Sequence, residues 1–181
     1  MIRKLLAIIV LVMVASLSIA GCTTSTNNTA TNSSPTRDAL LEKFVNATKQ
    51  EEYGNASNKV QAWDETWNNG TSVTILETVK ESSSGFNTTI AGNITIMSFP
   101  TPQDATNYLN AFDKTNYSLT STDYASDATA SHIYYNTTGH YPSVYKEYSY
   151  TEGSILSGSA KLHYLTQSDN IIQMLTATIS F

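Results

Sequence analysis

Apolar and polar residues alternate along many stretches of the last two thirds of the chain, and this period of two is typical of half-buried β-strands. The clearest pair, residues 60–67 and 72–81, flanks Asn69-Gly70, a dipeptide that tolerates the positive φ angles of a type I′ hairpin turn. We expect the remaining strands at residues 86–90, 94–99, 117–120, 131–135, 143–152, 159–166 and 171–181, with turns at 91–93, 136–139 and 167–170. The pattern therefore predicts a sheet built largely from hairpins.

Two other stretches repeat their apolar residues at the spacing of an α-helix. The first runs from about residue 37 to residue 53, and its apolar side consists of Leu40, Leu41, Phe44, Val45 and Thr48. The second begins at Thr101-Pro102, since threonine can cap a helix and proline suits its first position. Its stripe consists of Ala105, Tyr108, Leu109 and Phe112. Such a stripe must pack on another element, which we expect to be the sheet.

These elements predict an α+β fold, with an antiparallel twisted sheet of about six to eight strands and two helices on one face. The stretch Ile94–Phe112, where a helix follows a strand that ends in Phe99-Pro100, resembles the PsbP-like family of exported α+β domains. We divide the chain into a signal peptide (residues 1–21), a lipidated cysteine with a flexible tether (22–36) and a single globular domain (37–181).

The first 22 residues have the organisation of an export signal. Arg3 and Lys4 precede the uncharged run Leu5–Ile19, which is shorter than the roughly 20 residues of a membrane-spanning helix. Ile19-Ala20-Gly21-Cys22 resembles the lipobox of prokaryotic lipoproteins, which implies cleavage before Cys22 and a lipid on its sulfur. Two alternatives remain open: Cys22 as an ordinary thiol after a cleaved signal, and an uncleaved helix as the anchor. The resemblance implies an exported protein, anchored to the outer face of the cell membrane.

Charge and cysteine content narrow the possible partners. Without residues 1–21 the chain has eight basic and 15 acidic residues, a net charge of −7 that argues against nucleic acid and anionic lipid as partners. Charged residues make up 14% of the chain, against about a quarter in typical globular domains, so hydroxyls and amides must wet the surface. Cys22 is the single cysteine, so no disulfide can form within the chain.

Nine asparagines begin an Asn-x-Ser/Thr sequon, more than the composition predicts by chance. Two lie in the tether, Asn27 and Asn32, and the others are Asn46, Asn55, Asn69, Asn87, Asn93, Asn116 and Asn136. Asparagine and threonine also favour turns for backbone reasons, which is the alternative explanation. In an exported protein, however, each sequon is a candidate N-glycosylation site. An exported lipoprotein with many sequons and few charges resembles the cell-surface proteins of archaea.

Candidate catalytic and metal-binding residues do not converge in the sequence. Ser143-Val144-Tyr145-Lys146 and Ser168-Asp169-Asn170 match two motifs of penicillin-recognising serine enzymes, but the third motif, Lys-Thr-Gly, is missing. His132, His140 and His163 lack the close spacing typical of zinc ligands, so we expect no metal site. No motif for a cofactor is present, and we assign no catalytic residue.

Aromatic residues offer a candidate binding surface. Their ordinary role is to fill cross-strand pairs within a sheet. The period of two places Tyr148 and Tyr150 on the face opposite Tyr145, which would leave tyrosine exposed beside hydroxyl-rich neighbours. The possible aromatic binding face consists of Tyr145, Tyr148, Tyr150, Trp63 and Trp67. Such a surface suits a sugar, a peptide or another protein.

The sequence therefore favours a non-catalytic binding or structural module at the cell surface. Its expected partners are the membrane, through the lipid anchor, and a glycan or a surface protein. The alternative is a surface hydrolase that acts on cell-wall polymers, and a cleft that gathers His132 or His163 with a carboxylate would favour it.

Overall fold

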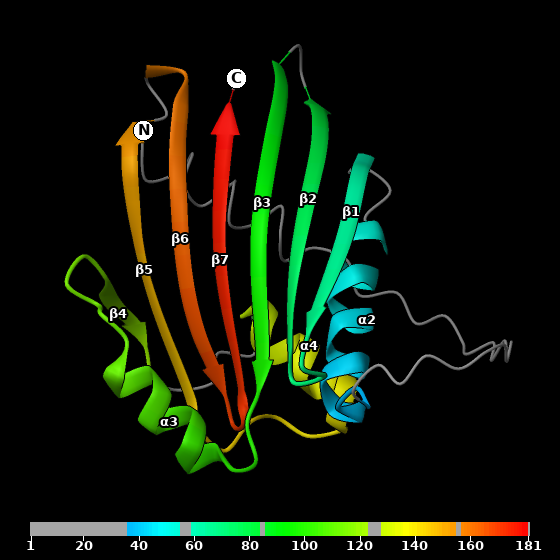
Figure 1. The fold of residues 1–181 in the computed structure, drawn as a ribbon. Helices are drawn as coiled ribbons and strands as arrows, with labels where there is room; N and C mark the ends of the chain where they lie inside the picture. The colour runs from blue at the N-terminus through cyan, green and yellow to red at the C-terminus, as the bar shows by residue number, and fades with distance from the viewer. Residues whose placement is uncertain (1–35, 55–58, 84–85, 123–127, 155–156, 181) are drawn as a thin grey trace, which may run out of the picture.

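The computed structural model describes residues 36–54, 59–83, 86–122, 128–154 and 157–180, so the predicted signal peptide, Cys22 and all but the last residue of the tether lie outside the described residues. The described part is an α+β fold, as predicted, with a seven-stranded antiparallel sheet and three helices (Figure 1). Its elements are α2 (Ala39–Gly54), β1 (Lys59–Asn68), β2 (Ser72–Ser83), β3 (Phe86–Ser98), α3 (Pro102–Ala111), β4 (Ser118–Ser121), α4 (Thr129–Thr138), β5 (Tyr145–Ser154), β6 (Ser159–Ser168) and β7 (Ile171–Ser180).

The strand order is β1-β2-β3-β7-β6-β5-β4, so the last strand of the chain lies at the centre of the sheet. β7 pairs with β3 on one side and with β6 on the other. This position explains the alternating pattern of β7, where Ala177 and Ile179 are buried on one face while Thr176 and Thr178 lie on the other. The C-terminal strand is thus part of the sheet, as predicted.

The first hairpin has the predicted turn, since Asn69 and Gly70 both have positive φ angles, 53° and 72°. The same turn fixes the start of α2: the Asp38 N–H donates to the Gly70 carbonyl at 2.8 Å, and a Cβ on Gly70 would overlap the carbonyl of Thr36. The Asp38 carboxylate then caps α2 by accepting the N–H of Leu41.

The prediction of two strands at residues 86–90 and 94–99 was wrong, because β3 runs without interruption through Gly92. Gly92 pairs with Glu77 of β2, whose Oε1 lies 2.5 Å from the position that a Cβ of Gly92 would occupy. The glycine therefore provides room for a neighbouring side chain rather than a turn.

The prediction of a strand at residues 131–135 was also wrong, because these residues belong to helix α4. Its buried side chains include Ala130, Ile133 and Tyr134, which have the i, i+3, i+4 spacing of a helix face. The predicted turn at 136–139 is instead the end of this helix, where Gly139 adopts a left-handed φ of 83° and its N–H donates to the Tyr135 carbonyl.

The helices cover both faces of the sheet, so the prediction of two helices on one face was wrong. α2 and α4 contact each other and pack on one face, which we call the α2/α4 face, over buried residues of β2 and β3. Of the described helices, only α3 packs on the opposite face, which we call the α3 face, with Ala105 and Leu109 against Leu165 and Ile172. Figure 1 shows α3 in front of the sheet and α4 behind it.

Candidate functional site

The structure does not bring the five predicted aromatic residues onto one surface. The strand register places Trp63, Trp67 and Tyr145 on the α2/α4 face, and Tyr148 and Tyr150 on the α3 face, so the predicted opposition of Tyr145 to the other two tyrosines is confirmed. Tyr145 is 3% exposed, and its hydroxyl donates to Glu147 at 2.6 Å. It is a core residue.

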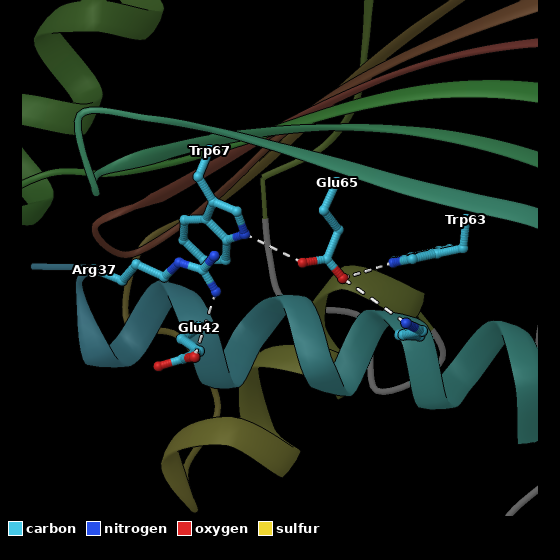
Figure 2. Close-up of polar contacts among 6 residues, drawn as sticks. Arg37, Glu42, Trp63, Glu65 and Trp67 are labelled. Carbon is cyan, nitrogen blue, oxygen red and sulfur yellow. Dashed lines mark hydrogen bonds and ion pairs between the residues drawn. The ribbon is translucent and has the colours of Figure 1, made fainter. Parts of the chain in front are cut away.

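Trp63 and Trp67 form part of an edge cluster that attaches α2 to β1 (Figure 2). Both indole N–H groups donate to the carboxylate of Glu65, at 2.9 and 3.2 Å. Arg37 lies 4.4 Å from the Trp67 ring, and Lys49 of α2 lies 5.7 Å from the Trp63 ring and 3.9 Å from the Glu65 carboxylate. The polar groups of the two tryptophans are thus engaged within the chain, and we assign this cluster a structural role.

Aromatic rings on the α3 face continue from the helix onto the sheet. Successive ring centroids lie 4.1–6.5 Å apart along Phe99, Tyr108, Phe112, Tyr117, Tyr150 and His163. Tyr148 packs beneath α3 with the apolar cluster of that face. Tyr150 is not part of that cluster, but its ring contacts Tyr117, which packs against the cluster.

His163 connects Tyr150 to two polar groups. The two rings are parallel to within 2°, with centroids 4.1 Å apart. The His163 Nε2 atom lies 3.6 Å from Glu152 Oε1, which also accepts the Tyr150 hydroxyl at 3.4 Å. The Thr176 hydroxyl lies 3.2 Å from Nδ1 on the other side of the imidazole. The Glu152 side chain is 53% exposed, whereas that of His163 is 12% exposed.

These residues belong to one row across the sheet. The row consists of Leu76, Asn93, Thr176, His163 and Tyr150, each paired with the next on neighbouring strands. Leu76 is 54% exposed and Asn93 is exposed. We call these five residues with Glu152 the α3-face row; it offers apolar, aromatic, amide, hydroxyl and carboxylate groups side by side.

Sequence reasoning assigned Tyr150 to this surface but missed the neighbours that complete it. Thr176 was not singled out, Asn93 was considered only as a glycosylation site, and His163 only as a possible metal ligand or as a partner of a carboxylate in a hydrolase. The signal that could have found them is the two-residue turn Asp169-Asn170, because a strand pair closed by it must pair His163 with Thr176. The predicted four-residue turn shifts that pairing by two residues.

Tyrosine pKa values argue against an activated phenolate. Burial is the largest cause that raises the pKa of Tyr150, and the Glu152 carboxylate raises it further. The same direction holds for the other tyrosines with a perturbed pKa, namely Tyr117, Tyr134 and Tyr164. These hydroxyls therefore remain protonated at neutral pH and act as hydrogen-bond donors rather than as bases.

The two serine-enzyme motifs do not form a serine-enzyme site. Ser143 is exposed and precedes β5 instead of opening a helix, and Ser168-Asp169-Asn170 spans the turn between β6 and β7. Asp169 is 6% exposed and accepts hydrogen bonds from the Tyr134 hydroxyl and the Val144 N–H. It joins α4, the segment before β5 and the turn, so its role is structural.

Each sequon asparagine whose side chain the structure describes is exposed: Asn46, Asn69, Asn93, Asn116 and Asn136. Asn27, Asn32 and Asn55 lie outside the described residues, and the side chain of Asn87 is not described. Among the five, Asn93 differs by lying in the middle of a strand, within the α3-face row. A glycan there would extend over that row.

Comparison with protein-family models, curated proteins and solved structures gave no match. Within the described ranges, no group of three or more His, Cys, Asp or Glu side chains is arranged to hold a metal ion. No helix of the described part is both long and apolar enough to cross a membrane.

Proposed function

We propose that this protein is a lipid-anchored, outward-facing binding module whose binding surface is the α3-face row. The observation that carries this proposal is the row itself, in which Tyr150, His163 and Glu152 lie beside Thr176 and the exposed Asn93. Aromatic edges next to hydrogen-bonding groups suit the apolar and hydroxyl sides of a sugar. The ligand class is therefore a glycan of the cell surface.

The anchor is supported by the lipobox-like Ile19-Ala20-Gly21-Cys22 and by the segment that follows it. From Cys22 to Thr36 the chain can extend over roughly 45 Å, at about 3.3 Å per residue. Such a tether lets the domain present either face of its sheet away from the membrane.

Cys22→Ser should release the protein from the membrane. A serine hydroxyl cannot take the place of the thiol to which the lipid is attached, so we expect most of the variant in the soluble fraction and the native protein in the membrane fraction. Fractionation and the intact mass of the extracted protein measure this, with Ser25→Ala as the control in the tether. Native protein that starts at an unmodified Thr23 or at Met1 would rule out lipidation.

Tyr150→Ala should weaken binding to purified cell-envelope glycan by about tenfold, since an aromatic contact contributes on the order of 1.5 kcal/mol. Tyr135→Ala is the matched control, because Tyr135 is 42% exposed but lies on α4, away from the row. Titration calorimetry measures both. Equal affinities for the two variants and the native protein would remove the row from the proposal.

A surface hydrolase is the second candidate, favoured by the arrangement of Thr176, His163 and Glu152 as hydroxyl, imidazole and carboxylate. Against it, Thr176 lies in a central strand whose backbone N–H groups face its neighbours in the ladder, so none is free beside it to stabilise an oxyanion. Release of reducing ends from the glycan that disappears in His163→Gln would favour the hydrolase over the binding module.

A further inference from the structure

Asn93 differs from the other described sequon asparagines in its neighbours. It begins the sequon Asn93-Ile94-Thr95 within β3, and it pairs with Leu76 on one side and with Thr176 on the other. Asn93 is exposed, Thr95 lies two residues further on the same α3 face, and Ile94 is buried on the opposite face. The acceptor amide therefore lies within the α3-face row itself.

We propose that Asn93 carries an N-linked oligosaccharide, and that this glycan covers the α3-face row and closes it to external glycans. The inference rests on the proposed function, because it concerns the regulation of the same surface. In the modification, the Asn93 side-chain nitrogen attacks C1 of the first sugar of a lipid-linked oligosaccharyl phosphate. A bond from this nitrogen to C1 forms, and the bond from C1 to the phosphate oxygen breaks. The lipid phosphate leaves with the electron pair, and the amide gives up one proton.

The topology of the sheet keeps Asn93 accessible until β7 has been made. β7 is the last strand in chain order, yet it lies beside β3 at the centre of the sheet (Figure 1). Thr176 follows its partner Asn93 by several seconds of synthesis, at about 5–20 residues per second. Until then β3 has only β2 as a possible neighbour, so its other edge stays open to a modifying enzyme.

Two other sequons lie in helices, whose backbone hydrogen bonds are local. These sequons begin at Asn46 in α2 and at Asn136 in α4. Their threonines, Thr48 and Thr138, each donate the side-chain hydroxyl to the carbonyl four residues earlier, at 2.9 and 2.8 Å. Helices form within about a microsecond, whereas β3 must wait for β7. We therefore expect a higher occupancy at Asn93 than at either helical site.

The position of Asn93 determines what its glycan covers. With about 4.8 Å between strands, His163 lies two strands away at about 10 Å, and Tyr150 lies three strands away at about 14 Å. An attached oligosaccharide has an effective concentration in the millimolar range at this surface, like a ligand on a short flexible linker. An external glycan must compete with it, so we expect the modification to weaken external binding at least tenfold.

The charged groups of the row lie toward its two ends. Asp64 pairs with Leu76 at the β1 edge of the sheet, and the Glu152 carboxylate accepts the Tyr150 hydroxyl at the other end. The two neighbours of Asn93 in the row, Leu76 and Thr176, are uncharged. A neutral sugar on Asn93 therefore lies over an apolar and a hydroxyl side chain, and it buries no charge there.

Glycopeptide mass spectrometry of the protein purified from its native cells tests the modification. Trypsin releases residues 81–114 as one peptide that contains the sequons of Asn87 and Asn93, and electron-transfer fragmentation locates the sugar within it. We expect an oligosaccharide on Asn93, at a higher occupancy than on Asn46 and Asn136. An unmodified Asn93 would overturn the proposal, whatever the row binds.

Thr95→Ala separates the effect of the glycan from that of the asparagine, because it removes the sequon and keeps the Asn93 side chain. We expect it to bind purified cell-envelope glycan at least tenfold more tightly than the native protein. Thr95→Ser keeps the sequon and should bind like the native protein. Thr71→Ala is the matched control, since it removes the sequon of Asn69 at the turn between β1 and β2, outside the row.

A second unmodified form keeps this test sharp if Thr95→Ala fails to fold. The native sequence made by cell-free synthesis without membranes cannot receive the oligosaccharide, and it should bind the external glycan as tightly as Thr95→Ala. Equal affinities of the glycosylated and the unmodified protein would overturn the proposal.

Leu76→Cys measures the covering without any external glycan. Leu76 is 54% exposed beside Asn93, and Tyr135→Cys is the control because Tyr135 is 42% exposed on α4. We expect maleimide to react with position 76 at least tenfold more slowly in the glycosylated protein than after the addition of Thr95→Ala. Position 135 should react at the same rate in both.

Equal rates at position 76 would contradict the covering by the glycan. If no form binds external glycan but position 76 is still protected, the proposed function is wrong and the covering glycan stands. The labelling and the binding measurements can therefore fail independently.

Discussion

Replacing Asp169 by alanine is expected to lower the free energy of unfolding by about 3 kcal/mol. The carboxylate accepts the Tyr134 hydroxyl at 2.9 Å and the Val144 N–H at 2.7 Å. Both donors would be left without an acceptor in a buried place, at a cost of about 1–3 kcal/mol each. Asp169 also has a φ of 49°, which aspartate tolerates better than alanine does.

Asp169→Asn is the matched control, since asparagine keeps one acceptor oxygen and tolerates the same backbone conformation. We expect it to cost clearly less than alanine, and Tyr134→Phe to cost about 1 kcal/mol. Urea unfolding followed by tryptophan fluorescence measures all three variants. If Asp169→Ala and Asp169→Asn unfold at the same urea concentration as the native protein, the turn is not joined to α4 as described.

Local chemistry was sufficient to predict those elements whose ends are set by their own residues. Asn69-Gly70 determines a turn through its positive φ angles, and Thr101 caps α3 by accepting the N–H of Asp104 at 3.1 Å. The stripe on α2 follows the same logic, since Leu41, Phe44, Val45 and Thr48 are all buried. In each case the signal that predicts the element lies in its own residues, although the α2 stripe is buried only because it packs on the sheet.

The two wrong predictions about strands concern elements whose conformation depends on contacts with residues far away in the sequence. Gly92 would suit a turn, but it lies in a strand because the Glu77 side chain of β2 fills the space beside it. Residues 131–135 have β-forming Ile133 and Tyr135, yet the helix gains burial of Ile133 and Tyr134 against α2, and this packing outweighs strand propensity. Isolated sequence windows contain neither of these contacts.

For the candidate site too, the sequence predicted what depends on a single strand and missed what depends on the pairing between strands. The period of two separated Tyr150 from Tyr145 correctly, because alternation is a property of one strand. The register of β5 with β6 places His163 beside Tyr150, and the register of β6 with β7 places Thr176 beside His163. Asn93 lies beside Thr176 because β7 also pairs with β3. A row that crosses five strands could therefore be assembled only from the structure.

Leu41→Ala is expected to lower the free energy of unfolding by about 3 kcal/mol, because it removes a side chain with no exposed surface from the contact between α2 and the sheet. Leu76→Ala changes the same atoms at a position that is 54% exposed, and it should cost less than about 0.5 kcal/mol. Urea unfolding of the two variants separates burial from residue type.

Comparing Leu41→Ala with Leu76→Ala also distinguishes the roles of the two faces of the sheet. Leu76 lies in the α3-face row, so Leu76→Ala should weaken glycan binding and leave the stability nearly unchanged. Leu41→Ala should lower the stability, but it should leave glycan binding unchanged at urea concentrations where the variant is still folded. Equal losses of stability in both variants would mean that α2 does not pack on the sheet.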